Sequence, residues 1–252
     1  MNEPVFFGKL PSANPIADDG DDLHFCSTCA FAPVCLPEGV DKHALRELHM
    51  LVEHVGPFRT GEAIFRTGDR FAAIYAVRGG TVQTRLVDDA GREQVLGFHL
   101  PGEVIGLNAI HPEIYPCDAI AIESTYVCRF SFPALAILAA KVPRVQQQLF
   151  RLLSADIGKA TQLAGDHSAD ERLAAFLLDL ADRYAARGFS DRRFHLTMTR
   201  VDIANYLRFA AETVSRVLRR FQDRQLVLIT GREVELLDLS ALRRLARNIS
   251  RR

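Results

Sequence analysis

The chain has 252 residues, 48% of them hydrophobic, which is long enough to bury one large core or two ordinary ones. It has no run of about eighteen apolar residues and no signal-peptide pattern at its start, so we expect a cytoplasmic protein without a membrane span. The formal net charge is zero, but residues 1–191 carry 17 basic and 25 acidic side chains while residues 192–252 carry 14 and 6. The basic C-terminal quarter predicts contact with a polyanion.

The first segment of the chain is rich in proline and acidic residues. Residues 1–25 hold Pro4, Pro11, Pro15 and an acidic run over residues 18–22, with little apolar periodicity. Such a segment has too few apolar side chains to form a packed core. We therefore expect a flexible N-terminal arm over residues 1–25.

Three cysteines follow the arm. Cys26, Cys29 and Cys35 lie within ten residues, which is compact enough for three thiols to reach one metal centre. In a reducing compartment, clustered cysteines favour metal or redox chemistry over structural disulfides. Cys117 and Cys128 lie eleven residues apart and do not form the second close pair that is typical of structural zinc sites. This spacing favours an iron–sulfur cluster, and it leaves a zinc site and a thiol–disulfide switch open.

From about residue 57 to residue 132, short stretches rich in β-forming residues alternate with turn signals. This regular short spacing predicts an antiparallel barrel or sandwich. Residues 73–77 and 81–87, separated by glycines, are expected to form a hairpin. We expect residues 26–142 to contain the cysteine loop and this β domain.

After Pro143 the apolar residues follow a helical period. The stripe includes Leu149, Leu152, Leu153, Ile157 and Ala160. A helix of this length suits either the core of one chain or a seam between two copies. We expect a long helix within residues 143–167, and the capping box Ser168-Ala169-Asp170-Glu171 predicts that a new helix begins there.

Residues 198–222 predict two short helices joined by a tight turn near Arg208, which is the spacing of a helix-turn-helix. Apolar residues of the second helix are expected to pack inward. Its outward polar side chains are then Glu212, Ser215, Arg216, Arg219 and Arg220. In the major groove of DNA an arginine can donate two hydrogen bonds to guanine, and a glutamate can accept one from cytosine. With a β wing expected over residues 226–237, we assign residues 168–252 to a DNA-binding domain.

Several of these segments resemble the FNR and Anr branch of the CRP/FNR superfamily of transcription regulators. They are Leu196–Arg200, Asn205–Leu207, Glu212–Arg216 and Arg220–Gln222, with further matches at Gly97–Leu100, Val127–Cys128 and Glu171–Phe176. The resemblance implies an α+β fold with an N-terminal antiparallel β-roll of the cyclic-nucleotide-binding kind, a long dimerisation helix and a C-terminal winged helix-turn-helix. It also implies that Glu212, Ser215 and Arg216 read a TTGAT half-site and its inverted repeat, whereas Arg219 and Arg220 are expected to meet phosphate.

The resemblance also implies a ligand set for the cysteines. Cys26, Cys29 and Cys35 match the family's spacing, Cys128 matches its distant fourth ligand, and Cys117 falls outside the set. In the family a [4Fe–4S] cluster stabilises the dimer without oxygen, and oxygen converts it to [2Fe–2S] with loss of DNA binding. We therefore expect an oxygen-responsive regulator that binds DNA as a homodimer and is not an enzyme.

Two further contacts follow from the resemblance. The exposed turn with Asp88, Asp89 and Arg92 is similar to a family hairpin that touches RNA polymerase. In the dimerisation helix, Asp156 accompanies the apolar stripe, and the family has an aspartate at the place of Ala160. Facing carboxylates in a helix seam oppose association, so Ala160 is expected to let the cluster-free chain dimerise more readily than the family pattern implies.

Arg208 departs from the family, which usually has a glycine in the turn between the two helices. A left-handed backbone at this position would cost an arginine about 1–2 kcal/mol.

The closest alternative is a CRP-like regulator that responds to another small ligand. A cyclic nucleotide needs an arginine for its phosphate. Relatives that bind one carry an Arg-Ser or Arg-Thr pair shortly after a Gly-Glu turn, whereas here Gly102-Glu103 is followed by Tyr115–Asp118. We expect no positive charge beside Asp118 and therefore no cyclic nucleotide.

Two weaker alternatives remain. A haem sensor would use His24, His99 or His111, without a supporting motif. An iron–sulfur electron-transfer enzyme would use the same cysteines, but the chain has no nucleotide-binding glycine motif.

Overall fold

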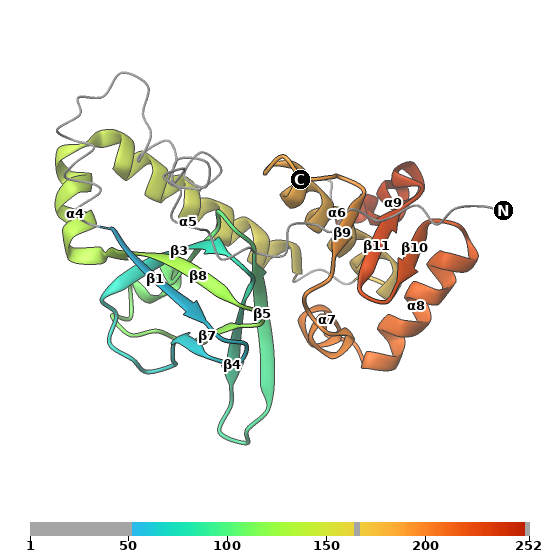
Figure 1. Cartoon of the computed structure of the whole chain (residues 1–252), viewed down its shortest axis with the longest axis horizontal. Helices are drawn as coiled ribbons and strands as arrows, with labels where there is room; N and C mark the ends of the chain where they lie inside the picture. The colour runs from blue at the N-terminus through green and yellow to red at the C-terminus, as the bar shows by residue number, and fades with distance from the viewer. Residues whose placement is uncertain (1–51, 164–166, 250–252) are drawn as a thin grey trace.

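The computed structural model describes residues 52–163 and 167–249. The long helix α5 (Pro143–Leu163) runs from a β domain towards a smaller domain of helices and short strands (Figure 1). Within the described residues, no helix combines the length and the apolar character needed to cross a membrane. The expected arm and Cys26, Cys29 and Cys35 lie outside these residues, as does the side chain of Ala160.

The β domain consists of two four-stranded sheets. One has the order β1-β8-β3-β6 and the other β2-β7-β4-β5. The strands of the first are β1 (Val52–Phe58), β8 (Thr125–Ser131), β3 (Ala73–Gly79) and β6 (Val104–Ile105). Those of the second are β2 (Ala63–Phe65), β7 (Asp118–Ala121), β4 (Val82–Val87) and β5 (Glu93–His99). All neighbouring strands are antiparallel, which confirms the predicted class of β domain.

The expected hairpin between residues 73–77 and 81–87 is wrong. Strand β3 pairs with β8 and β6, whereas β4 pairs with β5 and β7 in the other sheet. Gly80 stands at the crossing between the sheets with φ +80, and a Cβ there would collide with the backbone at Ser124 and Thr125. The glycines therefore carry the chain from one sheet to the other, in a close approach that the sequence pattern does not distinguish from a tight turn.

Aromatic side chains fill the space between the two sheets. Phe65 stacks on Tyr115 with ring centroids 4.0 Å apart, and Phe71 meets Tyr115 edge-on. The Tyr115 hydroxyl donates to the Ala73 carbonyl at 2.6 Å, and burial raises the pKa of Tyr115 to about 12. This hydroxyl is therefore a neutral, fixed part of the β-roll core.

Two helices cover the first sheet. The short helix η1 (Leu107–Ala109) follows β6, and α4 (Phe132–Lys141) follows β8 and buries Leu135 and Leu138 against Ile74 and Phe130. The sequence pattern does not predict α4, because its residues are apolar on nearly every side and show no period that separates helix from strand.

The C-terminal domain begins with α6 (Ala169–Ala185). The predicted capping box is confirmed: the Glu171 amide donates to Ser168 Oγ at 3.3 Å, and the Ser168 amide donates to the Glu171 carboxylate at 2.9 Å. These bonds satisfy two amides at the helix start that have no partner inside the helix.

A three-stranded sheet completes this domain, in the order β10-β11-β9. Its strands are β9 (Arg193–His195), β10 (Val227–Thr230) and β11 (Glu233–Leu236), and α9 (Leu239–Leu245) and η2 (Ala246–Asn248) follow. The wing expected at residues 226–237 is confirmed by β10 and β11, whereas β9 is not predicted by sequence. Buried Phe194 of β9 joins Leu173, Phe221 and Leu236 in the core, which also explains why so short a strand is stable.

Candidate nucleic-acid interface

Two helices joined by a tight turn form the centre of the C-terminal domain. They are α7 (Arg200–Leu207) and α8 (Ala211–Asp223), which together span the predicted stretch of residues 198–222 to within two residues at either end. Thr199 caps α7, because its hydroxyl accepts from the Asp202 amide at 3.1 Å and its own amide donates to the Asp202 carboxylate at 2.9 Å. A row of buried side chains anchors α8 to the domain core, namely Val214, Val217, Leu218 and Phe221. This anchoring fixes which face of α8 points to solvent.

The outward face of α8 carries the side chains that the sequence predicts. All five of them are exposed: Glu212, Ser215, Arg216, Arg219 and Arg220. The Ser215 hydroxyl donates back to the Ala211 carbonyl at 3.4 Å. These side chains form a polar row along one side of α8, and the opposite side of the helix is buried. A helix that enters a groove of DNA needs such an exposed polar side.

Arg220 differs from the other four. Its guanidinium binds the carboxylate of Asp170 on α6, with Arg220 Nε 3.2 Å from Asp170 Oδ2. A contact between Arg220 and a DNA phosphate would compete with this ion pair. The pair is formed between residues fifty positions apart, so helix periodicity alone does not reveal it.

Arg200 also borders this face, and it is not among the residues that the sequence predicts there. It lines a cleft of about 460 Å³ together with Ser215, Arg219 and Gln222. Among the described residues, its buried Nη1 has no hydrogen-bond partner, and burial lowers the pKa of Arg200. The signal that points to it is its position as the first residue of α7, directly beside the outward face of α8.

The turn between α7 and α8 is strained at Arg208. This residue has φ 60 and ψ 49, so its backbone lies in the left-handed region, where a side chain carries a steric cost. Its amide donates to the Asn205 carbonyl at 3.1 Å, which closes the end of α7.

Replacing Arg208 with glycine is expected to raise the free energy of unfolding by about 1 kcal/mol, because glycine adopts the left-handed backbone without steric cost. The gain is less than the full strain, since glycine also loses more backbone entropy on folding. Denaturant titration of both proteins measures the difference. The matched control is Arg224→Gly at the end of α8, where φ is −88 and no strain is relieved. A loss of stability at Arg208→Gly as large as that at Arg224→Gly would contradict the argument.

Comparison with known proteins identifies this architecture. The chain matches the cyclic nucleotide-binding domain over residues 56–141 and the Crp-like helix-turn-helix domain over residues 171–245. The transcriptional activator protein Anr of Pseudomonas protegens is 43% identical over 241 residues, which are 94% of each chain. The chain belongs to the FNR and Anr branch of the CRP/FNR family. It is a DNA-binding transcription regulator and not an enzyme.

Other relatives agree with this assignment. The fumarate and nitrate reduction regulatory protein of Escherichia coli is 39% identical over 235 residues, which are 92% of this chain and 93% of that protein. The structure of FixK2 from Bradyrhizobium japonicum aligns with a TM-score of 0.69 and 28% identity, covering 77% of this chain and 96% of FixK2. The α+β fold with a β-roll and a C-terminal helix-turn-helix is therefore confirmed.

The two described cysteines of this CRP/FNR regulator lie in different surroundings. Cys128 is half-buried on β8, opposite His54 on β1 and Ala76 on β3. Cys117 is 1% exposed, accepts a hydrogen bond from Asn108 Nδ2 at 3.6 Å, and has its pKa raised by burial. No group of three or more metal-binding side chains occurs in the described part of the chain, which does not include Cys26, Cys29 and Cys35.

The residues of the predicted dimer seam lie on different sides of the long helix α5. Leu149, Leu152 and Leu153 pack partly against the apolar cluster under α4. Asp156 lines a cavity of about 200 Å³ beside His99 of the same chain. By contrast, Ile157 is 68% exposed. Phe150, which does not belong to the predicted apolar stripe, is 60% exposed.

The turn at residues 88–92 closes the β4–β5 hairpin, as its sequence predicts. Asp88 holds it, because its carboxylate accepts from the Ala90 and Arg92 amides at 3.0 and 2.9 Å and from Arg92 Nε at 2.7 Å. These hydrogen bonds lower the pKa of Asp88, and the bond from the Arg92 amide has the largest effect. Asp89 and Arg92 are exposed at the tip.

One expectation about the β-roll is wrong. A positive charge does lie beside Asp118, because Arg85 Nε on β4 is 3.9 Å from the Asp118 carboxylate. Arg85 also pairs with Glu93 at 2.9 Å, so two carboxylates share its charge. The sequence does not show this contact because Arg85 and Asp118 become neighbours only through the pairing of β4 with β7.

Proposed function

We propose that this regulator senses oxygen through a [4Fe–4S] cluster held by Cys26, Cys29, Cys35 and Cys128. The observation that carries the proposal is the contrast between the two described cysteines. Cys128 is half-buried on a sheet face, whereas Cys117 is enclosed and its thiol form is favoured. Four thiolates are the usual ligand set of an iron–sulfur cluster. When the cluster is bound, it would supply the reactivity towards oxygen.

The DNA target that we propose is the TTGAT inverted repeat. Glu212, Ser215 and Arg216 read its bases from α8, and Arg219 lies beside the backbone. The exposed row on α8 supports this reading, as does the family that the chain belongs to. We infer that RNA polymerase is the second macromolecular partner.

Anaerobic purification followed by an absorption spectrum before and after air tests the proposal. We expect iron–sulfur absorption that bleaches in air, together with a loss of binding to a TTGAT inverted repeat. Unchanged DNA binding in a protein that has lost its iron would contradict oxygen sensing.

The interior of the β-roll argues against a cyclic nucleotide as the signal. Phe65 and Tyr115 stack within it, and Arg85 is paired with Asp118 and Glu93. A titration with cyclic AMP that tightens operator binding would favour the alternative, a regulator controlled by another small ligand.

We propose that α5 forms the seam of a homodimer, with residues 26–142 as sensor domain, 143–167 as dimerisation helix and 168–252 as DNA-binding domain. The exposed apolar side chains of Phe150 and Ile157 support this, since a lone chain would leave them in water. Ile157→Glu is expected to raise the dissociation constant of the dimer by about tenfold or more, because a charge would be buried in the seam. Sedimentation velocity without oxygen measures the effect.

The sequence predicts that Asp156 lies in the seam, but it lines a cavity within its own chain. Asp156→Ala should therefore change dimerisation less than Ile157→Glu, and it serves as the control. Equal effects of the two substitutions would contradict the assignment of faces. The same measurement on cluster-free protein tests the role of Ala160. Ala160→Asp should reduce residual dimer in air, and no change would show that charge in this helix does not set the switch.

We propose that the hairpin tip at Asp88, Asp89 and Arg92 contacts RNA polymerase. Changing all three to alanine is expected to lower transcription in a reconstituted assay about fivefold while operator binding stays the same. Because Asp88 holds the turn, the variant Asp89→Ala with Arg92→Ala separates lost contact from lost turn geometry. Normal activation by both variants would remove this contact.

A further inference from the structure

The DNA-binding domain packs directly against the β-roll of the same chain. Phe98 on β5 contacts Phe176 of α6 and Tyr206 of α7, with ring centroids 6.2 and 5.5 Å apart. Val95 and Leu100 belong to the same apolar cluster as the core of the C-terminal domain. The two domains therefore share one continuous core along β5, and apolar packing alone brings them together without fixing their angle.

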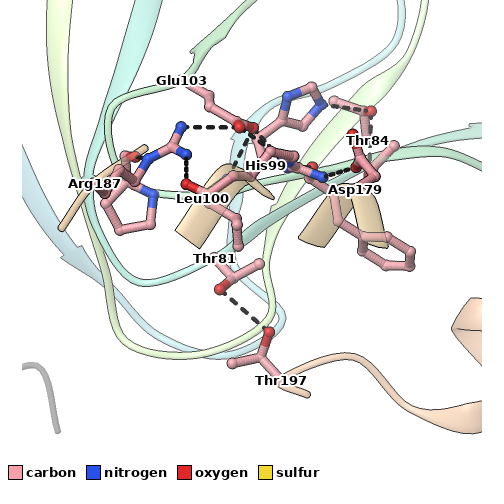
Figure 2. A network of polar contacts seen from close by, with 12 residues as sticks. Thr81, Thr84, His99, Leu100, Glu103, Asp179, Arg187 and Thr197 are labelled. Carbon is pink, nitrogen blue, oxygen red and sulfur yellow. Dashed lines mark hydrogen bonds and ion pairs between the residues drawn. The ribbon is translucent and has the colours of Figure 1, made fainter. Parts of the chain in front are cut away.

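Polar contacts beside this core come from one turn of the β-roll. Glu103 accepts from Arg183 Nε at 2.8 Å and Nη2 at 2.7 Å, and from Arg187 Nη2 at 2.9 Å. Arg183 also donates to the Phe98 carbonyl at 2.5 Å, and Arg187 donates to the Pro101 carbonyl. Figure 2 shows Arg187 and Glu103 facing each other across the domain boundary, with Leu100 beside them. Arg183 near the end of α6 and Arg187 just after it therefore bind the Glu103 carboxylate and two backbone carbonyls of the β-roll.

The geometry and burial of this cluster make it directional. The side chains of Glu103, Arg183 and Arg187 are 13%, 16% and 11% exposed. Burial lowers the pKa of Arg183, but Glu103 and then Asp179 raise it by more, so the guanidinium stays charged at this boundary. The Leu100 amide donates to the Glu103 carboxylate at 3.1 Å, so the acceptor is also held by the backbone of its own domain. A bidentate contact to a fixed carboxylate restricts angle as well as distance.

A second contact holds α7 to the β-roll. Asn205 donates from Nδ2 to the Glu93 carbonyl at 2.7 Å and accepts from the Val95 amide at 2.8 Å. Gln83 Nε2 donates to the Asp202 carboxylate at 3.1 Å. Together with the contacts that Glu103 makes to Arg183 and Arg187, these bonds hold α6 and α7 of the DNA-binding domain against the β-roll.

We propose that Glu103 is a positioning residue for DNA binding, which acts through Arg183 and Arg187 to set the angle of the DNA-binding domain on the β-roll. Two copies of α8 reach successive half-sites only if both are held at one spacing and one angle. Without the carboxylate, two guanidinium groups stay at a domain boundary with one fewer partner, and DNA must order a looser domain when it binds. Glu103 therefore contributes to affinity without touching DNA.

The test compares Glu103→Gln with the matched control Glu53→Gln in the full chain, prepared without oxygen. Glu53 pairs with Arg129 at 2.9 Å, but both residues belong to the β-roll. We expect Glu103→Gln to weaken binding to a TTGAT inverted repeat about tenfold, with unchanged base preference and dimer fraction, and Glu53→Gln to change it less than about twofold. Glu103→Asp, which keeps the charge, should recover much of the loss.

Two further measurements keep the test decisive. A double-mutant cycle with Arg187→Gln should show non-additive losses, because the two residues act on one contact. Hydrogen exchange needs no DNA, so it tests the contact separately from the proposed operator: Glu103→Gln should speed exchange in residues 181–187 and leave β1 unchanged. Wild-type affinity and exchange in Glu103→Gln, additive losses, or an equal loss in Glu53→Gln would overturn the proposal.

Discussion

Replacing Arg216 with alanine is expected to weaken operator binding by about 1–3 kcal/mol, which is roughly fivefold to 150-fold. The loss should be concentrated at one guanine, because Arg216 lies on the exposed face of α8 and has the geometry to donate two hydrogen bonds to a base edge. Glu212→Ala should relax preference at a neighbouring cytosine by the same mechanism. Fluorescence anisotropy against operators changed one base pair at a time measures both effects.

Arg219→Ala is the control for Arg216→Ala. A phosphate contact carries no sequence information, so its loss should weaken all operators alike and reduce the salt dependence of binding. If Arg216→Ala also weakened every operator equally and kept its base preference, its role in base reading would be excluded.

Replacing Cys128 with serine is expected to abolish the anaerobic iron and sulfide content of the purified protein. A serine hydroxyl does not supply the thiolate that the proposed fourth position needs. Cys117→Ser is the control, since that sulfur is enclosed and already accepts a hydrogen bond from Asn108. Iron and sulfide analysis of both variants decides between the two cysteines.

The opposite pattern would contradict the ligand assignment. If Cys117→Ser lost iron and Cys128→Ser kept it, the fourth ligand would be Cys117. Loss in both variants together with a lower thermal midpoint would indicate damage to the β-roll and not to a ligand. Thermal unfolding of both variants therefore accompanies the analysis.

Local chemistry made much of the fold predictable. The capping box at Ser168 and the helix-turn-helix spacing depend on neighbours within a few positions, and their bounds agree with α6, α7 and α8. Elements that depend on distant partners were not predictable. Strand β9 is stabilised by Phe194 in a core formed by other segments, and the glycines at residues 79–80 cross between sheets where a hairpin is expected.

The candidate site follows the same division. The outward row on α8 could be read from periodicity, because the buried residues of the same helix fix its orientation. The ion pair between Arg220 and Asp170, the grip of Arg183 on Glu103 and the contact of Arg85 with Asp118 join residues 33 to 80 positions apart. Only the folded chain brings such charges together, so no local pattern reveals them.

Strand β5 lies at the edge of its sheet, and the amide side chain of Asn205 occupies the place that another strand would take there. An exposed edge of this kind is a template on which other chains can pair and aggregate. The DNA-binding domain thus shields the β-roll from self-association. If it swung away, one amide and one carbonyl of β5 would lose their partners together. Those two unpaired groups would then stand at an open strand edge, the condition under which strands of other chains can add to a sheet.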